Sequence, residues 1–285
     1  MSETAPRREI SRRRVLTTFG GTAGLMTLGL LNNSALAATA APDAGDQFDR
    51  MRATWQNILT GGDFDPTDPD IAPIVSASDA TAASYINLID RSADRSQLFT
   101  DQPLVVEQNA EAANRVARSF NRLQAMATAF RTPGSRFEGD ESVLVDVLEG
   151  LELLNQRVYN ENQEEFGDFW ASFFNWEIAN PLALTSACVM VYDHLPADAL
   201  ARYMAAIDFY VADPRFFYPD DERHRVSGGS NRLGLCLNVA LRGMLGKNEE
   251  RLQTAKDALA DVFEFLTGEG DGFHRDGAFT MHETV

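Results

Sequence analysis

Apolar residues recur along the chain at steps of three and four positions, the spacing of one face of an α-helix. Between residues 109 and 130 the series is Ala113, Val116, Ala117, Phe120, Leu123 and Met126. The segment "LVDVLEGLELLNQRVY" at 144–159 has the same pattern. No segment alternates apolar and polar residues convincingly, as a half-buried strand would. The pattern therefore predicts an all-α fold.

Clusters of Pro, Gly and Asp separate the helical patterns. The expected helices are Asp46–Thr60, Asp79–Leu88, Asn109–Phe130, Glu141–Val158, Leu182–His194, Ala197–Val211, Asn231–Leu245 and Glu249–Leu266. Helices paired through loops of varying length predict helical hairpins arranged as a toroid or a solenoid. The long loops collect aromatic and charged residues, so we expect function to lie there.

The first part of the chain has the features of an export signal. In "SRRRVLTTFGG" a run of arginines precedes an apolar stretch from Val15 to Leu31, and Ala35 and Ala37 offer a signal-peptidase site. A membrane anchor is the alternative, but glycines and threonines make the stretch weakly apolar for a span of ~20 residues. We expect a twin-arginine signal peptide at 1–37, a linker at 38–45 and a secreted protein without stable membrane insertion after cleavage.

Acidic residues dominate the composition. The chain has 25 Lys and Arg against 42 Asp and Glu, for a net charge of −17, and only two lysines. Nucleic acid is excluded as a partner, because no basic cluster is present to replace phosphate counterions. An anionic substrate would need a local basic patch to overcome the overall field.

Few residues suggest a metal, a cofactor or a disulfide. Cys188 and Cys236 lie in apolar helical runs, which indicates buried free thiols. No His or Cys spacing matches a zinc site, and "GEGDGF" lacks the ligand series of an EF-hand. We expect no metal, no cofactor and a monomer.

The first loop that could carry chemistry is "EEFGDFWASFFNWEIANPLAL". Its six aromatic residues are Phe166, Phe169, Trp170, Phe173, Phe174 and Trp176. They could form the core at a helix end. With Asp168, Asn175, Glu177 and Asn180 beside them, they could equally form a sugar-binding wall, in which rings cover the C–H faces of pyranoses and amides bond the hydroxyls.

Two further loops contain candidate polar groups. In "DERHRVSGGSNRLGL", Ser230 or Asn231 could simply be a helix N-cap. Alternatively, Asn231 beside Arg232 could receive a carboxylate, because the N–H groups and dipole of a helix start favour an anion. The closing stretch "GDGFHRDGAFTMHETV" contains His282, and a lone histidine is more often structural than catalytic.

In this order the loops resemble polysaccharide lyase family 8, the hyaluronate, chondroitin and xanthan lyases. The similar motifs are "WxxILTGG" and "DPTDPD" at 55–70, "YN…G…W…NWEI" at 159–178, "GxNR" at 229–232, "LRGxxGK" at 241–247 and "GDGFxxDGxFxxH" at 270–282. The resemblance covers residues 46–285. It implies that they form part of an N-terminal (α/α) toroid, incomplete and without the family's C-terminal antiparallel β domains.

The resemblance also implies a reaction, β-elimination across a uronic acid to give an unsaturated sugar. Its central task is to neutralise the carboxylate so that C5 can lose a proton. By resemblance, Asn231 binds the carboxylate and His282 assists. The implied substrate-binding residues are Phe173, Phe174, Asn175, Trp176, Glu177, Arg225 and Arg232. The family often has tryptophans where the two phenylalanines stand.

In the family a tyrosine that acts as general base and acid follows the histidine, and this sequence stops at Val285 before one. We therefore expect a truncated lyase with little or no activity by itself. Two alternatives stay open. One is an exported, non-catalytic toroid that binds anionic glycans. The other is a toroid glycoside hydrolase that uses two carboxylates, chosen from Asp168, Glu177, Asp271 and Asp276.

Overall fold

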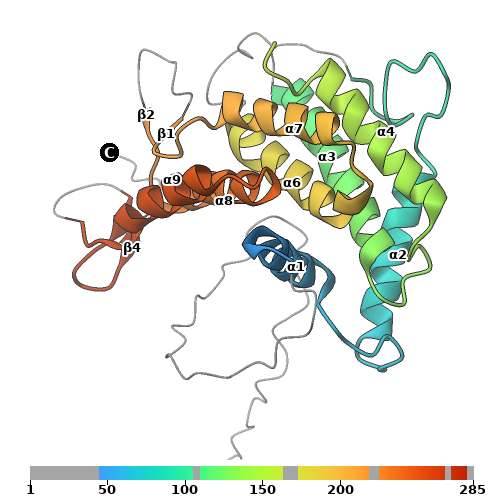
Figure 1. Ribbon diagram of the computed structural model, residues 1–285, viewed down its shortest axis with the longest axis horizontal. Helices are drawn as coiled ribbons and strands as arrows, with labels where there is room; N and C mark the ends of the chain where they lie inside the picture. Colours follow the sequence, from blue (N-terminus) through green and yellow to red (C-terminus); the bar gives the residue numbers. More distant parts are fainter. Residues whose placement is uncertain (1–44, 105–109, 163–172, 218–224, 267–270, 281–285) are drawn as a thin grey trace, which may run out of the picture. The chain divides into compact units, whose positions relative to one another are not determined.

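The computed structural model describes residues 45–104, 110–162, 173–217, 225–266 and 271–280. This part of the chain is mostly helical, which confirms the all-α prediction (Figure 1). The α-helices are α1 (Gln47–Thr60), α2 (Ala72–Ile86), α3 (Ala110–Arg131), α4 (Glu141–Arg157), α6 (Asn180–Met190), α7 (Ala197–Tyr210), α8 (Gly229–Leu245) and α9 (Glu249–Ala260). The shorter turns are the π-helix η1 (Phe174–Ala179) and the 3-10 helices η2 (Tyr192–His194) and η3 (Asp261–Phe263). The expected signal peptide and most of the linker lie outside the described residues.

Side-chain caps fix several helix starts where the sequence predicted them. The Asp46 carboxylate accepts hydrogen bonds from the N–H groups of Phe48 and Asp49 and begins α1, and Asp140 begins α4 in the same way. The predicted start of α2 at Asp79 is wrong, because the helix begins at Ala72. Asp79 is buried instead, and its carboxylate accepts a hydrogen bond of 2.5 Å from the Ser135 hydroxyl.

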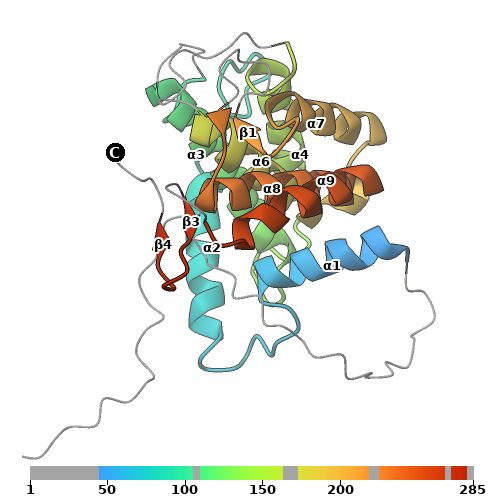
Figure 2. The same ribbon diagram turned by 90° about the vertical axis from the view of Figure 1, so that its left-hand side faces the viewer.

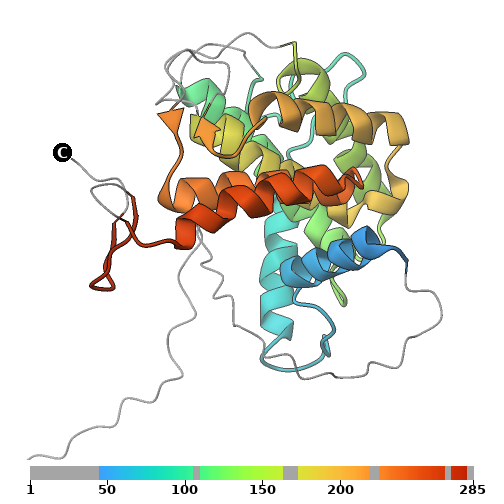
Figure 3. The ribbon, with the colours of Figure 1, turned by 60° about the vertical axis from the view of Figure 1, so that its left-hand side comes forward.

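Two short antiparallel hairpins were missed by the sequence pattern. Strand β1 (Phe216–Phe217) pairs with β2 (Arg225–Val226), and β3 (Gly272–Phe273) pairs with β4 (Phe279–Thr280). Two residues per strand are too few to show an alternating pattern. Helix α9 is also shorter than predicted, ending at Ala260. Both hairpins lie at the end of the molecule where α8 begins (Figure 3).

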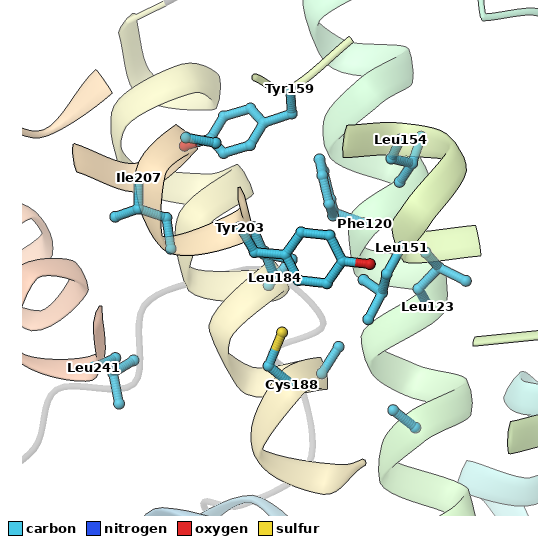
Figure 4. Packing of buried hydrophobic residues seen from close by; sticks show 14 of the residues in the cluster. Phe120, Leu123, Leu151, Leu154, Tyr159, Leu184, Cys188, Tyr203, Ile207 and Leu241 are labelled. Atoms are coloured by element: carbon cyan, nitrogen blue, oxygen red, sulfur yellow. The ribbon is translucent and has the colours of Figure 1, made fainter. Parts of the chain in front are cut away.

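The core lies between α3, α4, α6 and α7. Helix α3 packs on α6 and α4, and α6 packs on α8, which in turn packs on α9. Figure 4 shows the side chains that fill this space, which include Phe120, Leu123, Leu151, Leu184 and Tyr203. All of them are at most 1% exposed, so apolar burial stabilises the contacts between these helices.

Both cysteines are buried free thiols, as predicted. Cys188 on α6 faces the same core (Figure 4), and burial raises the pKa of its thiol above the ordinary value. A thiol that stays protonated is a poor nucleophile, so Cys188 serves as an apolar packing group.

Helices α1 and α8 lie close together, with α9 packed on α8 (Figure 2). An arginine network joins α7, α8 and α9, because the Asp208 carboxylate accepts from Arg242 at 2.8 Å and pairs with Arg251 at 2.7 Å. None of the helices in the described part of the chain is long and apolar enough to cross a membrane. Closure into a toroid stays a prediction.

The core makes a direct prediction. Leu151 on α4 is fully buried, so Leu151→Ala removes apolar contacts and leaves a cavity, and it should lower the free energy of unfolding by about 2–5 kcal/mol. Urea unfolding followed by circular dichroism measures this loss. Val145→Ala on the same helix is the control, since Val145 is 50% exposed and its truncation should change stability by less than about 0.5 kcal/mol. Equal losses would contradict the placement of the core.

Candidate functional site

Helix α8 starts without a side-chain cap. Its N-cap is Gly228, which is extended with φ −145° and, as a glycine, has no side chain that could make a cap hydrogen bond. Gly229 follows with φ +50°, a left-handed conformation that favours glycine. Ser230 and Asn231 therefore lie inside the first turn, so the alternative that one of them is the N-cap is wrong. A helix start of this kind presents N–H donors and the positive end of the dipole.

Two polar side chains stand at or near this helix start. Asn231 is half-buried, and its amide makes no hydrogen bond with any residue in the described ranges. Arg225 on β2 is half-buried as well, and it pairs in register with Phe217 of β1. The region therefore combines an uncommitted amide, a guanidinium and a helix dipole, three features that favour an anion.

Arg232, the neighbour of Asn231, faces inward. It is 6% exposed, and its guanidinium donates to the carbonyls of Ser227 at 2.7 Å and Ala258 at 3.1 Å. It also donates to the Ser227 hydroxyl at 2.5 Å and to the Arg215 carbonyl at 3.3 Å. Arg232 thus joins the hairpin, the start of α8 and the end of α9.

A second contact holds the hairpin at the same place. The Ser227 N–H donates to the Arg215 carbonyl at 2.9 Å, and its hydroxyl donates to the Pro214 carbonyl at 2.7 Å. Nearby, hydrogen bonds from the Arg215 side chain hold the pKa of the Asp213 carboxyl below its ordinary value, and the charge of Arg232 acts in the same direction. The turn at 213–215 therefore supports the segment that leads into α8.

The aromatic segment divides into a buried and an exposed part. Phe174 is 43% exposed, whereas Phe173 is 9% exposed and packs edge-to-face on Phe217 with ring centroids 4.9 Å apart. Trp176 is 1% exposed and stacks between Tyr159 and Tyr210, with centroid distances of 6.1 and 5.6 Å. Trp176 thus belongs to the core and the ring of Phe174 is exposed, while Phe166, Phe169 and Trp170 lie outside the described residues. The sugar-binding wall stays a prediction.

The polar residues of this segment divide in the same way. Asn175 is 9% exposed, and its amide donates at 3.0 Å to the side-chain oxygen of Asn114 on α3. Asn114 itself is exposed. Glu177 is completely buried. Asn175 and Asn114 form an amide pair next to the exposed Phe174, while Glu177 lies within the protein.

The segment η1 and the start of α8 are in contact. A Cβ atom placed on Gly234 would lie 3.0 Å from Ile178 Cγ2, so this glycine permits close packing of α8 on η1. The Asn238 amide donates to the carbonyls of Glu177 at 2.9 Å and Ile178 at 3.0 Å. Since Phe173 also packs on the hairpin, the structure brings η1, the β1–β2 hairpin and the start of α8 together. We call this region the candidate site.

The closing stretch reaches the candidate site through Asp271. A Cβ atom on Gly228 would lie 3.2 Å from Asp271 Cβ, so this side chain lies beside the start of α8. In the following hairpin, a ring nitrogen of His274 lies 2.5 Å from the Thr280 hydroxyl. His282 lies outside the described residues, so its expected proximity to Asn231 stays a prediction.

The carboxylates considered for hydrolysis differ in exposure and in the element on which they lie. Asp271 lies at the start of α8, Asp276 is exposed in the β3–β4 turn, Glu177 is buried in η1, and Asp168 lies outside the described residues. In the ranges that the structure describes, no three His, Cys, Asp or Glu residues are grouped so as to hold a metal ion. The arrangement is best suited to hydrogen bonding of an anion and to ring stacking.

Three contributors to the site were not identified from the sequence. They are Asn114, Asn238 and Phe217. Asn238 carries a detectable signal, because it is a polar residue within the apolar run "LGLCLNVAL" and follows Asn231 by two helical turns. Asn114 and Phe217 depend on contacts across the fold and carry no such signal.

The helical fold is that of a polysaccharide-lyase domain. Residues 55–285 match the N-terminal alpha-helical domain of polysaccharide lyase family 8, and the chain belongs to this family. The family resemblance of the motifs is therefore confirmed.

Relatives include several lyases. A hyaluronate lyase of Thermasporomyces composti is 31% identical over 240 residues, which are 84% of this chain and 28% of that protein. A xanthan lyase of Bacillus sp. strain GL1 is 30% identical over 244 residues, 85% of this chain and 24% of that protein. The structure of Streptomyces coelicolor A3 chondroitin AC lyase in complex with chondroitin sulphate matches with a TM-score of 0.72 and 30% identity, over 84% of this chain and 30% of that chain. The chain thus spans less than a third of the length of these relatives.

The inward position of Arg232 predicts a large stability cost. Arg232→Met leaves several buried carbonyls without donors, so the free energy of unfolding should fall by about 3 kcal/mol. Arg275→Met, on the exposed β3–β4 turn, is the control and should change it by less than about 0.5 kcal/mol. Thermal or urea unfolding distinguishes the two, and a small loss for Arg232→Met would show that these hydrogen bonds contribute little.

The lowered pKa of Asp213 predicts a pH dependence. A carboxyl whose pKa is lower in the folded state stabilises the protein above its ordinary value of 3.8, and this contribution disappears as the pH falls through the folded-state pKa. Asp213→Asn should therefore lower the free energy of unfolding by up to about 1 kcal/mol at neutral pH. The difference should shrink in acid. Urea titrations from pH 7 to about pH 3 test this, and a difference independent of pH would contradict it.

Proposed function

We propose that this chain binds a uronic-acid-containing polysaccharide of the hyaluronan, chondroitin or xanthan type and belongs to a lyase that cleaves it by β-elimination. Family membership supports the reaction class. The observation that carries the proposal for this chain is the amide of Asn231, which makes no hydrogen bond within the described residues and lies in the first turn of a helix whose N-cap is a glycine. Arg225 and the exposed ring of Phe174 belong to the same site.

The chemistry explains why a neutral donor is useful here. The C5 proton of a uronic acid is barely acidic while the neighbouring carboxylate is ionised. Hydrogen bonds from the Asn231 amide and from first-turn N–H groups would stabilise the additional charge that develops on that carboxylate. In this proposal His282 assists at the same centre, as in the family resemblance, and Arg225 attracts the anionic polymer.

The other predicted residues receive different roles. Phe174 stacks on the apolar face of a sugar ring, and Asn175 with Asn114 bonds sugar hydroxyls. Phe173 and Trp176 support this surface from beneath, since both are buried. Arg232 contributes by holding the backbone, and Glu177 is completely buried, so neither side chain touches the polymer.

The place where the polysaccharide occurs suggests where the protein acts. Large extracellular polysaccharides are met outside the cell, which is consistent with a twin-arginine signal at residues 1–37, cleavage of that signal and secretion. We propose that residues 46–285 then act as a monomeric helical domain of the lyase.

Isothermal titration of the chain with hyaluronan and chondroitin sulphate oligosaccharides tests the binding step. Phe174→Ala should weaken binding by a factor of about three to ten, since the loss of ring stacking on a sugar is of the order of 1 kcal/mol. Phe209→Ala on α7 is the matched control, because Phe209 is 42% exposed and Phe174 is 43% exposed. It should leave the affinity unchanged.

Two outcomes would contradict the proposal. The native chain could fail to bind every acidic oligosaccharide, or the two phenylalanine variants could weaken binding equally. The elimination step is measured separately, through the ultraviolet absorbance of unsaturated sugar ends. Saturated ends would instead indicate hydrolysis.

A further inference from the structure

The π-helical segment η1 is followed by a proline, which removes one backbone donor from its helical hydrogen bonds. In regular helical pairing, the carbonyl of Glu177 would accept from the N–H of residue 181, and in π-helical pairing the carbonyl of Trp176 would accept from the same residue. Residue 181 is a proline at the start of α6 and has no N–H group. Both carbonyls lie in the protein interior, where an unpaired polar group is costly.

Side chains from two other segments donate to carbonyls of η1. The Tyr159 hydroxyl, just beyond α4, donates to the Trp176 carbonyl at 2.9 Å. The Asn238 amide, from α8, donates to the carbonyls of Glu177 and Ile178. Asn238 is completely buried, so its amide contributes no contact with solvent.

Asn238 lies on the face of α8 that leads to Asn231. Asn231, Gly234 and Asn238 are spaced by three and four residues, so they follow one stripe of the helix. Gly234 allows the close approach to Ile178, and Asn238 fixes the position of η1 along the stripe by hydrogen bonds. The first residues of η1 are Phe174 and Asn175.

We propose that Asn238 is a positioning residue of the polysaccharide site. Its amide sets the place of η1 on α8, and therefore the place of the Phe174 ring relative to the Asn231 amide, without touching the polymer. This inference rests on the proposed function. It adds that affinity for an acidic oligosaccharide depends on a buried amide two helical turns away from Asn231.

The test uses two variants of Asn238 in the full chain. Asn238→Leu keeps a similar volume without a donor, and Asn238→Asp keeps the shape without the N–H groups. The dissociation constant for a hyaluronan or chondroitin sulphate oligosaccharide should rise about tenfold in both, the effect expected when two buried carbonyls lose their donor and the segment shifts. Near-ultraviolet circular dichroism should change as well, since Trp176 of η1 stacks between Tyr159 and Tyr210.

The control is Gln102→Leu, the loss of another buried amide. Gln102 is 4% exposed, and its amide donates to the Arg115 carbonyl at 2.6 Å and the Ser119 hydroxyl at 2.7 Å, both on α3. It should lower stability but leave the affinity and the near-ultraviolet spectrum unchanged. If the Asn238 variants behave like this control, the proposal is wrong.

A milder variant keeps the test decisive if the Asn238 variants do not fold. Tyr159→Phe removes only the hydroxyl that donates to the Trp176 carbonyl and keeps the ring stack. It should raise the dissociation constant by a smaller factor, and an unchanged affinity would overturn the role assigned to the anchoring of η1. If the native chain binds no oligosaccharide, the proposed function fails. The role of Asn238 is then judged by the near-ultraviolet spectrum, and an unchanged spectrum in Asn238→Leu, or in Tyr159→Phe if that variant alone folds, would overturn it.

Discussion

The buried guanidinium of Arg232 is the interaction on which the candidate site depends. A buried charge is tolerated only when its N–H groups are hydrogen-bonded, and here the partners are the carbonyls of Ser227, Arg215 and Ala258, which are 5, 17 and 26 residues away in the sequence. Because the guanidinium is planar and its donors have fixed directions, it fixes the relative positions of the turn before β1, the start of α8 and the end of α9. The first turn of α8, which has a glycine as its N-cap, is therefore held from the interior of the protein by Arg232.

The same principle governs the aromatic segment. Pro181 interrupts the ladder of backbone hydrogen bonds between η1 and α6, and the resulting carbonyls are satisfied from outside by Tyr159 and Asn238. A backbone that needs donors from its neighbours is tied to them, whereas a regular helix satisfies itself and is positioned by packing alone. The irregular backbone of the π-helix is therefore held in a fixed contact with α8, and this contact positions the aromatic segment. π-helical turns are frequent at functional sites, and this one has an identifiable cause.

The sequence predicted those features that depend on local physics. Apolar periodicity located the long helices, and the predicted starts at Asp46 and Glu141 lie within a residue of the observed starts of α1 and α4. Prediction from the sequence failed where contacts between distant segments determine the structure. Asp79 has the composition of a helix start, but it is satisfied by Ser135 from another loop, and α2 extends past it. Arg232 next to Asn231 suggested a substrate contact, and only the fold shows that its donors are bound to carbonyls inside the protein.

The strongly acidic composition also constrains how such a site can work. With a net charge of −17, the long-range field repels an anionic polymer. Many arginines are committed to carboxylates, as Arg242 and Arg251 are to Asp208 and Arg202 is to Glu152. Apart from the proposed contribution of Arg225, attraction in the proposed site must then come from groups that act at short range, such as amides, backbone N–H groups and the dipole of α8. These groups are uncharged or nearly so, and they bind a carboxylate only when it is in contact and correctly oriented. A site of this kind gains little from long-range electrostatic steering of the polymer. It favours the bound geometry in which additional negative charge on the carboxylate is stabilised. β-Elimination requires this stabilisation.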